Sequence, residues 1–580
     1  MKRATLVFAC IMMVLCLRAQ DDNRVLMTIG KETITVSDFV KAYQKNNMLS
    51  EATENDLREY RELFINYRLK VQEAEAMQLD TTASFKAELG SYETQSAQPY
   101  LVDTDVSEGL VEEAYERSKS QVRASHILIR CNPAAAPKDT LAAYHKIMDI
   151  REKIINGLDF NEAAALYSED ESAREYVNPQ NNTHHYGNKG ELGYFSIFEM
   201  IYPFESAAFN TPVGSVSMPF RTQFGYHLVY VQDKIRALGR IWVSQVFVAD
   251  STALSGNISK EVSDRLALIK SQYAKGIPFD SLAKWYSDDK ATRENGGHME
   301  PFGPSRRPGN YVAAAIKTPK GQMSDPVPTT LGWHFLRCDS LSYATVNEES
   351  RYMLKQRLSR DSRAQKGKDA LVKRLMKEYN YEESGKTKAF KFLSKNIDTN
   401  YFQSKDNDIT SLKGIEKLKP ICTFADQNLS VKDFAQFVSR YQGVKLNGTV
   451  SDFLEQIYPK FVSDNILSYE RSHLKEKYPE FNDLVKEFHD GMLLYEINTQ
   501  KVWGAAIQDS IGLANFYEQI KTNFPNPDLT SAIEYQPLSE IRAIVITRYQ
   551  DFLEQEWVKE LRAKYPIKID ENVFTSILKR

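Results

Sequence analysis

The chain has 580 residues, of which 42% are hydrophobic and 26% charged, and its net charge is −3. This length exceeds what one hydrophobic core supports, so we expect several domains. No basic run is present, which argues against a nucleic acid partner. No segment after the first twenty residues reaches the ~18 consecutive apolar residues of a membrane-spanning helix, so we do not expect an integral membrane protein.

Residues 1–19 have the pattern of a secretory signal peptide. Two basic residues precede an apolar run over 4–17, and Ala19 supplies a small residue at its end. The pattern predicts export and cleavage near Ala19. A lipid anchor on Cys10 or Cys16 is the alternative. Lipidation favours small residues before the cysteine, whereas Cys16 follows Val14 and Leu15 and Cys10 follows Phe8 and Ala9.

Three cysteines remain beyond the signal peptide: Cys131, Cys338 and Cys422. Their wide spacing excludes a zinc-binding CxxC cluster and a dense disulfide framework. We expect them to be buried as small apolar residues.

The middle of the chain contains an internal repeat. Residues 160–170 reappear at 279–289, at an offset of 119 residues, whereas 204–214 match 311–321 at an offset of 107. The first copy therefore carries an insertion, and the Asn-, Gly- and Pro-rich stretch 177–188 predicts that it forms a surface loop. Two related domains follow one another.

We place these two domains at 121–236 and 237–345. In the first, the apolar pattern predicts a strand over Val122–Arg130 and a helix over Leu141–Asn156, with a closing strand near Tyr226–Val231. Each copy is therefore expected to mix helices with a small sheet.

The flanking regions, 20–120 and 346–580, have long helical patterns. They also share a weak echo, because residues 28–39 recur at 423–434. In both places we expect a short strand, a turn and a helix with a capping hydroxyl and a buried phenylalanine, namely Thr35 with Phe39 and Ser430 with Phe434.

Four motifs in the first copy carry a family resemblance. They are ASHIL at 124–128, GELGYF at 190–195, FE at 204–205 and TQFGYH at 222–227. In this order they resemble the parvulin family of peptidyl-prolyl cis-trans isomerases, and the whole layout resembles the SurA-type periplasmic chaperones. The resemblance implies a multidomain α+β protein with two tandem parvulin domains, each a small antiparallel sheet wrapped by helices. Helical N- and C-terminal chaperone-like regions would flank them.

The resemblance also implies an active site in the first copy. His126 and His227 look like the family's paired histidines, Thr222 like the hydroxyl that links them, and Asp170 like its Cys-or-Asp position. Four apolar residues look like the walls of the family's proline pocket: Leu192, Met200, Phe204 and Phe224. Structural explanations compete with this, because Met200 and Phe204 are also spaced as core residues of a helix.

The reaction suits these residue types. Rotation about an X-Pro amide faces a barrier of ~18–20 kcal/mol, and no covalent bond breaks, so no nucleophile, metal or cofactor is required. Removing the amide from water and gripping the proline ring both assist rotation. Histidines near the amide can set the local field. His184 and His185 lie next to each other without a nearby cysteine or carboxylate array, so we expect no metal site there.

The second copy departs from this pattern. Its replacements, Gln245, Met299, Arg307, Tyr311 and Leu331, stand where the first copy has His126, Leu192, Met200, Phe204 and Phe224. The corresponding Asp289, Thr329 and His334 are retained. A charge at a pocket wall is costly unless it is paired or turned outward. We therefore expect a weak or inactive second isomerase domain.

The sequence thus predicts a periplasmic peptidyl-prolyl isomerase and folding chaperone for exported or outer-membrane proteins. Its partners would be unfolded or extended polypeptides that contain X-Pro bonds. The alternative is a non-catalytic holdase or scaffold subunit of an envelope secretion or assembly machine. A hydrolase is disfavoured, because neither GxSxG nor HExxH occurs.

Overall fold

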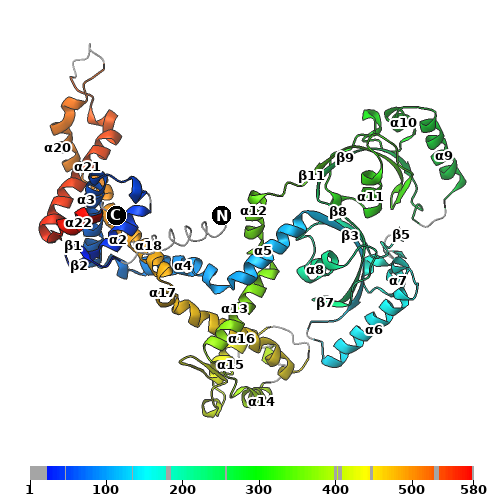
Figure 1. The fold of residues 1–580 in the computed structure, drawn as a ribbon, viewed down its shortest axis with the longest axis horizontal. Coiled ribbons are helices and arrows are strands. Elements are labelled where there is room, and N and C mark those ends of the chain that lie inside the picture. The colour runs from blue at the N-terminus through cyan, green and yellow to red at the C-terminus, as the bar shows by residue number, and fades with distance from the viewer. Residues whose placement is uncertain are drawn as a thin grey trace, which may run out of the picture. The chain divides into compact units, whose positions relative to one another are not determined.

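The computed structural model describes residues 22–45, 47–133, 135–177, 180, 184–254, 258–397, 401–402, 408–443, 448–527 and 534–577. The predicted signal peptide and the side chains of His184 and His185 lie outside the described residues. By its contacts the chain forms two compact units (Figure 1): Met1–Gln98 with Arg471–Arg580, and Pro99–Glu470. We call them unit 1 and unit 2.

Unit 1 combines the two ends of the chain. Its sheet has the order β14-β1-β2, so a strand close to the C-terminus pairs with one close to the N-terminus. One core cluster joins buried residues of the first helices to those of the last. The elements are β1 (Val25–Ile29), β2 (Glu32–Thr35), α2 (Val36–Gln44), α3 (Glu54–Ala76), α4 (Ala83–Ser96), α17 (Leu474–Lys477), α18 (Pro479–Asn498), α19 (Gly504–Gln508), α20 (Ser510–Ile520), α21 (Leu538–Lys564), β14 (Ile567–Ile569) and α22 (Glu571–Ile577).

Unit 2 contains both repeated domains. After α5 (Thr104–Ser118), the first copy forms a four-stranded antiparallel sheet of order β6-β3-β8-β7. Its elements are β3 (Ser120–Arg130), α6 (Pro137–Ile155), α7 (Phe160–Tyr167), β4 (Tyr176–Val177), β5 (His184–His185), β6 (Glu191–Phe195), α8 (Tyr202–Asn210), β7 (Phe220–Thr222) and β8 (Gly225–Arg236). The predicted strands and helix of this copy are confirmed, and α6 begins earlier because Pro137 occupies its first turn.

The second copy repeats this arrangement with the sheet order β10-β11-β9. Its elements are β9 (Leu238–Ala249), α9 (Lys260–Ala274), α10 (Phe279–Tyr286), α11 (Gly309–Lys317), β10 (Val327–Thr329) and β11 (Gly332–Tyr343). Small antiparallel sheets packed by helices, with helical regions on both sides in sequence, confirm the predicted multidomain α+β class.

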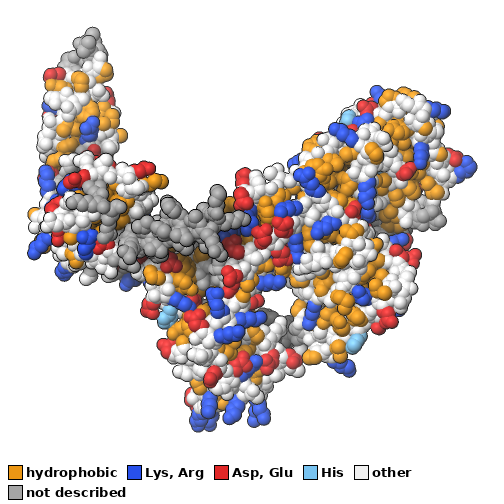
Figure 2. Space-filling model, viewed as in Figure 1, with side chains coloured by type: hydrophobic (Ala, Val, Ile, Leu, Met, Phe, Trp, Pro, Cys, Tyr) orange, Lys and Arg blue, Asp and Glu red, His pale blue; other side chains and the backbone are white. Residues whose placement is uncertain are grey.

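Unit 2 ends in a helical lobe with its own core. It consists of α12 (Glu348–Leu358), α13 (Gln365–Glu378), α14 (Lys386–Asn396), β12 (Cys422–Phe424), β13 (Gln427–Leu429), α15 (Val431–Ser439) and α16 (Val450–Ser472), which continues past the end of the unit. On the face drawn in Figure 2, Lys and Arg side chains gather over the part of this lobe that carries α14. The net charge of −3 is therefore unevenly spread.

The two segments that echo each other in the flanks have the same local structure, a pair of short strands followed by a capped helix. Thr35 accepts a hydrogen bond from Asp38 N–H at the start of α2, and Ser430 does the same with Asp433 at α15. Both helices begin with a full capping box, which supplies partners for two otherwise unpaired backbone groups. Phe39 and Phe434 are completely buried. Cys131, Cys338 and Cys422 are buried, as expected, and none of them forms a disulfide.

Candidate active site

The sheet of the first copy brings the two histidines together. His126 on β3 pairs with Val229 of β8, and His227 on β8 pairs with Leu128 of β3. The histidines are thus diagonal neighbours on one face, because residues two apart on a strand share a face. Their rings are nearly parallel, with centroids 5.8 Å apart. This face is the one covered by α8, whereas α6 and α7 cover the other.

Thr222 and Asp170 each hold one histidine. Thr222 Oγ1 lies 2.8 Å from His227 Nε2 and also accepts a hydrogen bond from Phe224 N–H. Asp170 Oδ2 lies 2.9 Å from His126 Nε2, and its other oxygen accepts hydrogen bonds from the Ser172 backbone and hydroxyl. The structure therefore brings together the four residues that were predicted to be catalytic.

Burial determines the charge of these groups. It lowers the pKa of His227 to about 4 and also lowers the pKa of His126, where the opposing charge of Asp170 is too weak to compensate. Burial alone would raise the pKa of Asp170, but hydrogen bonds from Ser172 and the contact with His126 bring it below its ordinary value. At neutral pH the site thus holds two neutral histidines beside one carboxylate.

Both histidines retain hydrogen-bonding capacity. Nδ1 of His126 and Nδ1 of His227 are buried and form no hydrogen bond with any residue in the described part of the chain. A buried polar atom without a partner is costly, by ~1–3 kcal/mol. Such atoms are commonly retained where a ligand supplies the missing partner.

Aromatic rings surround the pair. The Phe204 ring lies edge-on to both histidines, with centroids 5.6 Å away in each case. Leu192 and Met200 are partly exposed and pack against the core cluster that contains Phe204. Phe224 is held next to Thr222 by its backbone N–H, and its side chain is 54% exposed. Of the predicted pocket residues, Phe204 therefore contacts both histidines, Leu192 and Met200 pack against the core cluster that contains Phe204, and the Phe224 side chain is exposed.

Two residues, Phe220 and Glu205, have contacts here for which the sequence had predicted no role. Phe220 on β7 stacks on His227 with centroids 5.5 Å apart, and its alternation with Thr222 along the strand is the signal that could have identified it. Glu205 follows Phe204 in α8 and is completely buried. A carboxylate within an apolar helix face was the available sign that it has partners.

Glu205 joins the first copy to the segments before and after the repeats. Its carboxylate accepts hydrogen bonds from Arg117 of α5 and from both terminal nitrogens of Arg363, at 2.8 to 3.1 Å. It also accepts the Phe198 N–H at 2.7 Å. This bond holds the turn just before Met200, in which Phe198 has a φ of 63°. The buried ion cluster thus fixes the loop and helix that carry Met200 and Phe204.

In the second copy, the residues at the positions of the candidate active site form hydrogen bonds with one another. Gln245 Oε1 lies 3.0 Å from His334 Nδ1 and accepts the Tyr311 hydroxyl at 3.2 Å. Gln245 Nε2 donates to Asp289, and His334 Nε2 lies 2.9 Å from Thr329 Oγ1. His334 Nδ1 therefore has a partner, whereas the equivalent Nδ1 of His227 has none among the described residues.

Arg307 does not enter this network. Its side chain is exposed, and its guanidinium carbon lies 5.3 Å from the centre of the Phe302 ring. The charge is turned outward, which avoids the cost of burying it.

The two copies contact each other within unit 2. Gly193 of β6 approaches Gly309 of α11 so closely that a Cβ on Gly309 would lie 2.8 Å from Gly193 Cα. Tyr194 packs into the core cluster of the second copy, and Lys317 forms an ion pair with Asp233 at 3.3 Å.

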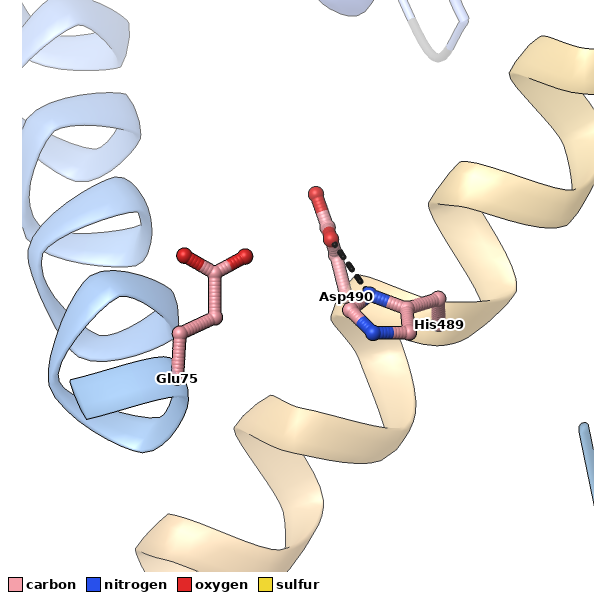
Figure 3. Close-up of side chains that lie close together, drawn as sticks. All are labelled: Glu75, His489 and Asp490. Carbon is pink, nitrogen blue, oxygen red and sulfur yellow. Dashed lines mark hydrogen bonds and ion pairs between the residues drawn. The ribbon is translucent and has the colours of Figure 1, made fainter. Parts of the chain in front are cut away.

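One cluster of potential metal ligands occurs among the described residues, and it lies in unit 1. Glu75 of α3 faces His489 and Asp490 of α18 (Figure 3), with ligand atoms within 4.8 Å of one another. Asp490 already forms a 2.5 Å salt bridge with Arg68, which in turn pairs with Glu32. The cluster therefore belongs to an ion-pair network that joins α3 to α18.

Two segments of the chain match the PPIC-type PPIASE domain family: residues 111–235 and residues 250–340. The chain contains two parvulin-type domains. Within the described ranges, no helix combines the length and apolarity needed to cross a membrane.

Curated relatives match over the parvulin region. Chaperone SurA of Methylococcus capsulatus is 27% identical over 222 residues, which cover 37% of this chain and 45% of the relative. Chaperone SurA of Nitrosococcus oceani is 25% identical over 232 residues, covering 40% and 51%. Foldase protein PrsA of Geobacillus kaustophilus is 33% identical over 132 residues, covering 23% and 38%. The chain spans about half the length of the curated relatives it matches, or less.

Proposed function

We propose that the first parvulin domain is a peptidyl-prolyl cis-trans isomerase and that His126, Asp170, Thr222 and His227 form its active site. The observation that carries this proposal is the pair of buried, neutral histidines whose Nδ1 atoms lack partners among the described residues. A neutral imidazole can donate or accept a hydrogen bond. The histidines can therefore stay hydrogen-bonded to the substrate amide while its charge distribution changes during rotation.

The apolar residues would act on the proline ring. Leu192, Met200, Phe204 and Phe224 would hold the ring while the preceding carbonyl swings. Apolar walls also remove the amide from water, which disfavours the charge-separated resonance form and lowers the rotational barrier. Asp170 would orient His126 and strengthen the electric field at the site. It would not act as a base, since no proton leaves the substrate.

We infer that the whole chain is an exported, periplasmic folding chaperone with unfolded or outer-membrane protein clients. Relatives named chaperone SurA and foldase PrsA support this role, and so does the signal-like sequence at 1–19. The second parvulin domain would be a weak or inactive isomerase that is retained for binding or architecture. The boundaries proposed for the two domains are 121–236 and 237–345.

The test measures cis-trans exchange of an X-Pro tetrapeptide by NMR exchange spectroscopy with the purified protein. Two variants copy the second domain into the first: His126→Gln and Met200→Arg. Each is expected to lower the rate at least tenfold, which is about 1.4 kcal/mol in the barrier. Phe224→Ala is expected to lower it too, whereas the matched change Leu331→Ala in the second domain leaves it unchanged.

A folded protein that does not accelerate the exchange would refute the isomerase. A non-catalytic holdase or scaffold would then be favoured, and suppression of client aggregation would persist in His126→Gln. Recovery of the protein from the periplasmic fraction, with Gln20 as its first residue, tests the proposed export.

A further inference from the structure

Unit 1 contains a groove that the isomerase site does not account for. It runs between α4 and α18 and has a volume of about 860 Å³. That volume lies within the range of ~300–1,000 Å³ that is usual for ligand sites. From Leu484 to Glu496, α18 contributes a lining residue at every third or fourth position, so one continuous helix face forms this wall.

The groove is largely apolar and open. Tyr92 of α4 and Phe488 of α18 stack across it, with ring centroids 3.6 Å apart. Leu484 and Tyr495 also line it and are 39% and 64% exposed. Exposed apolar side chains that line one groove with a polar rim are typical of a binding site.

All charged side chains that line the groove are negative. The charged lining residues are Glu88, Glu487 and Glu496, and the lining includes no lysine, arginine or histidine. Glu487 forms an ion pair with Lys45. Glu88 and Glu496 form no ion pair with any residue in the described ranges. Two carboxylates at the rim of an apolar groove favour an occupant with positive charges at its ends.

A glycine in the wall keeps the groove open. Gly491 lines it, and a Cβ at this position would meet no heavy atom within 4 Å. Glycine in a helix costs roughly 0.5–1 kcal/mol relative to alanine. Its absence of a side chain therefore leaves room in the groove at a small cost in stability.

We propose that this groove binds a polypeptide segment with bulky apolar side chains flanked by lysine or arginine. The α18 face from Leu484 to Glu496 is ~18 Å long, which matches five or six residues of extended chain. This site goes beyond the isomerase, because it lies in unit 1 and requires no proline. It would hold segments of a client that the isomerase site does not recognise.

The experiment measures fluorescence anisotropy of labelled, proline-free nonapeptides with the purified protein. Each peptide has the same central Phe and Leu residues and carries two lysines, two glutamates or two glutamines at each end. The lysine peptide is expected to bind at least tenfold more tightly than the glutamate peptide at low salt. This advantage is expected to shrink as salt screens the rim carboxylates.

Two matched glycine variants locate the site. Gly491→Trp fills the groove and is expected to weaken the lysine peptide at least tenfold. Gly90→Trp on α4 places the same side chain in open space away from the lining, and it leaves affinity within twofold. The double variant Glu88→Gln/Glu496→Gln is expected to retain binding but remove the preference for lysine over glutamate ends.

Circular dichroism of both tryptophan variants verifies that they fold. If Gly491→Trp does not fold, Gly491→Leu replaces it. Unchanged affinity in the folded groove variant, or equal binding of lysine and glutamate peptides, would overturn the proposal. A purified protein that is dimeric, and that the groove variant makes monomeric, would also overturn it, because the occupant would then be a second copy. Because no peptide contains proline, failure of the isomerase would not affect these readings.

Discussion

Replacing Arg363 with methionine removes the main partner of a buried carboxylate in the first parvulin domain. Arg363 donates from both terminal nitrogens to Glu205, at 2.9 and 2.8 Å. The side chains are 1% and 0% exposed, so water cannot replace the arginine. Methionine has similar length and retains the apolar packing of the arginine stem.

The expected cost follows from what remains around Glu205. Breaking a buried ion pair by removing one partner costs ~3–5 kcal/mol, because the other charge stays buried. Arg117 at 3.1 Å and the Phe198 N–H at 2.7 Å still contact the carboxylate. We therefore expect about 3 kcal/mol, at the lower end of that range.

Hydrogen exchange measured by mass spectrometry is the suitable assay. A chain with several domains does not unfold in a single two-state step, whereas exchange reports the local opening free energy of each element. A loss of about 3 kcal/mol raises the opening of α8 by roughly a hundredfold. Since α8 carries Phe204, X-Pro isomerisation is expected to fall as well.

Arg357→Met provides the control. Arg357 is exposed and stacks on Phe198, at 4.5 Å from the ring centre, but no contact with Glu205 is found for it among the described residues. Its replacement is expected to change the local free energy by less than ~0.5 kcal/mol. Slow exchange of α8 in Arg363→Met, equal to that in the wild type, would show that Arg117 alone neutralises Glu205 and would refute this reasoning.

Acidification is expected to destabilise the first domain as the pH falls from ~6.5 to 4. The pKa of His227 is about 4 in the folded protein, so in this range the histidine is protonated in the unfolded chain but largely neutral in the folded one. The loss reaches ~3 kcal/mol at pH 4, and His227→Gln is expected to lack it when hydrogen exchange measures the opening free energy of β8 across this range. Gly309→Val is expected to force the two parvulin domains apart and speed exchange in β6, whereas Gly109→Val, in open space on α5, does not. Ser430→Ala removes one capping box and is expected to cost ~1 kcal/mol, visible as faster exchange in α15.

Local patterns predicted the local structure well. The internal repeat, the strand over β3, the helix α6 and both capped helices follow from residue spacing and cap chemistry, which act over a few residues. The diagonal placement of the histidines also follows once β3 and β8 are neighbours. The family resemblance supplied that pairing, which periodicity alone cannot give.

Contacts between residues far apart in the sequence could not be predicted from local patterns. Glu205 and Arg363 are 158 residues apart, and nothing near either residue indicates the other. The helical pattern of the region after residue 346 also did not show that α12 ends at Leu358 and α13 begins at Gln365, with the buried Arg363 in the short turn between them. The union of the two chain ends in unit 1 likewise depends on contacts across the whole chain.

The two parvulin domains share one scaffold, but the hydrogen bonds around Gln245 differ from those around His126. Gln245 offers both a donor and an acceptor, so it pairs with Asp289, Tyr311 and His334 at once. A network in which every member is satisfied stabilises the core and leaves nothing for a substrate amide. In the first domain the histidine at this position leaves ring nitrogens without partners among the described residues. A substrate amide that pairs with those atoms would offset the cost of leaving them unpaired, which is why the first domain is the one to which we assign catalysis.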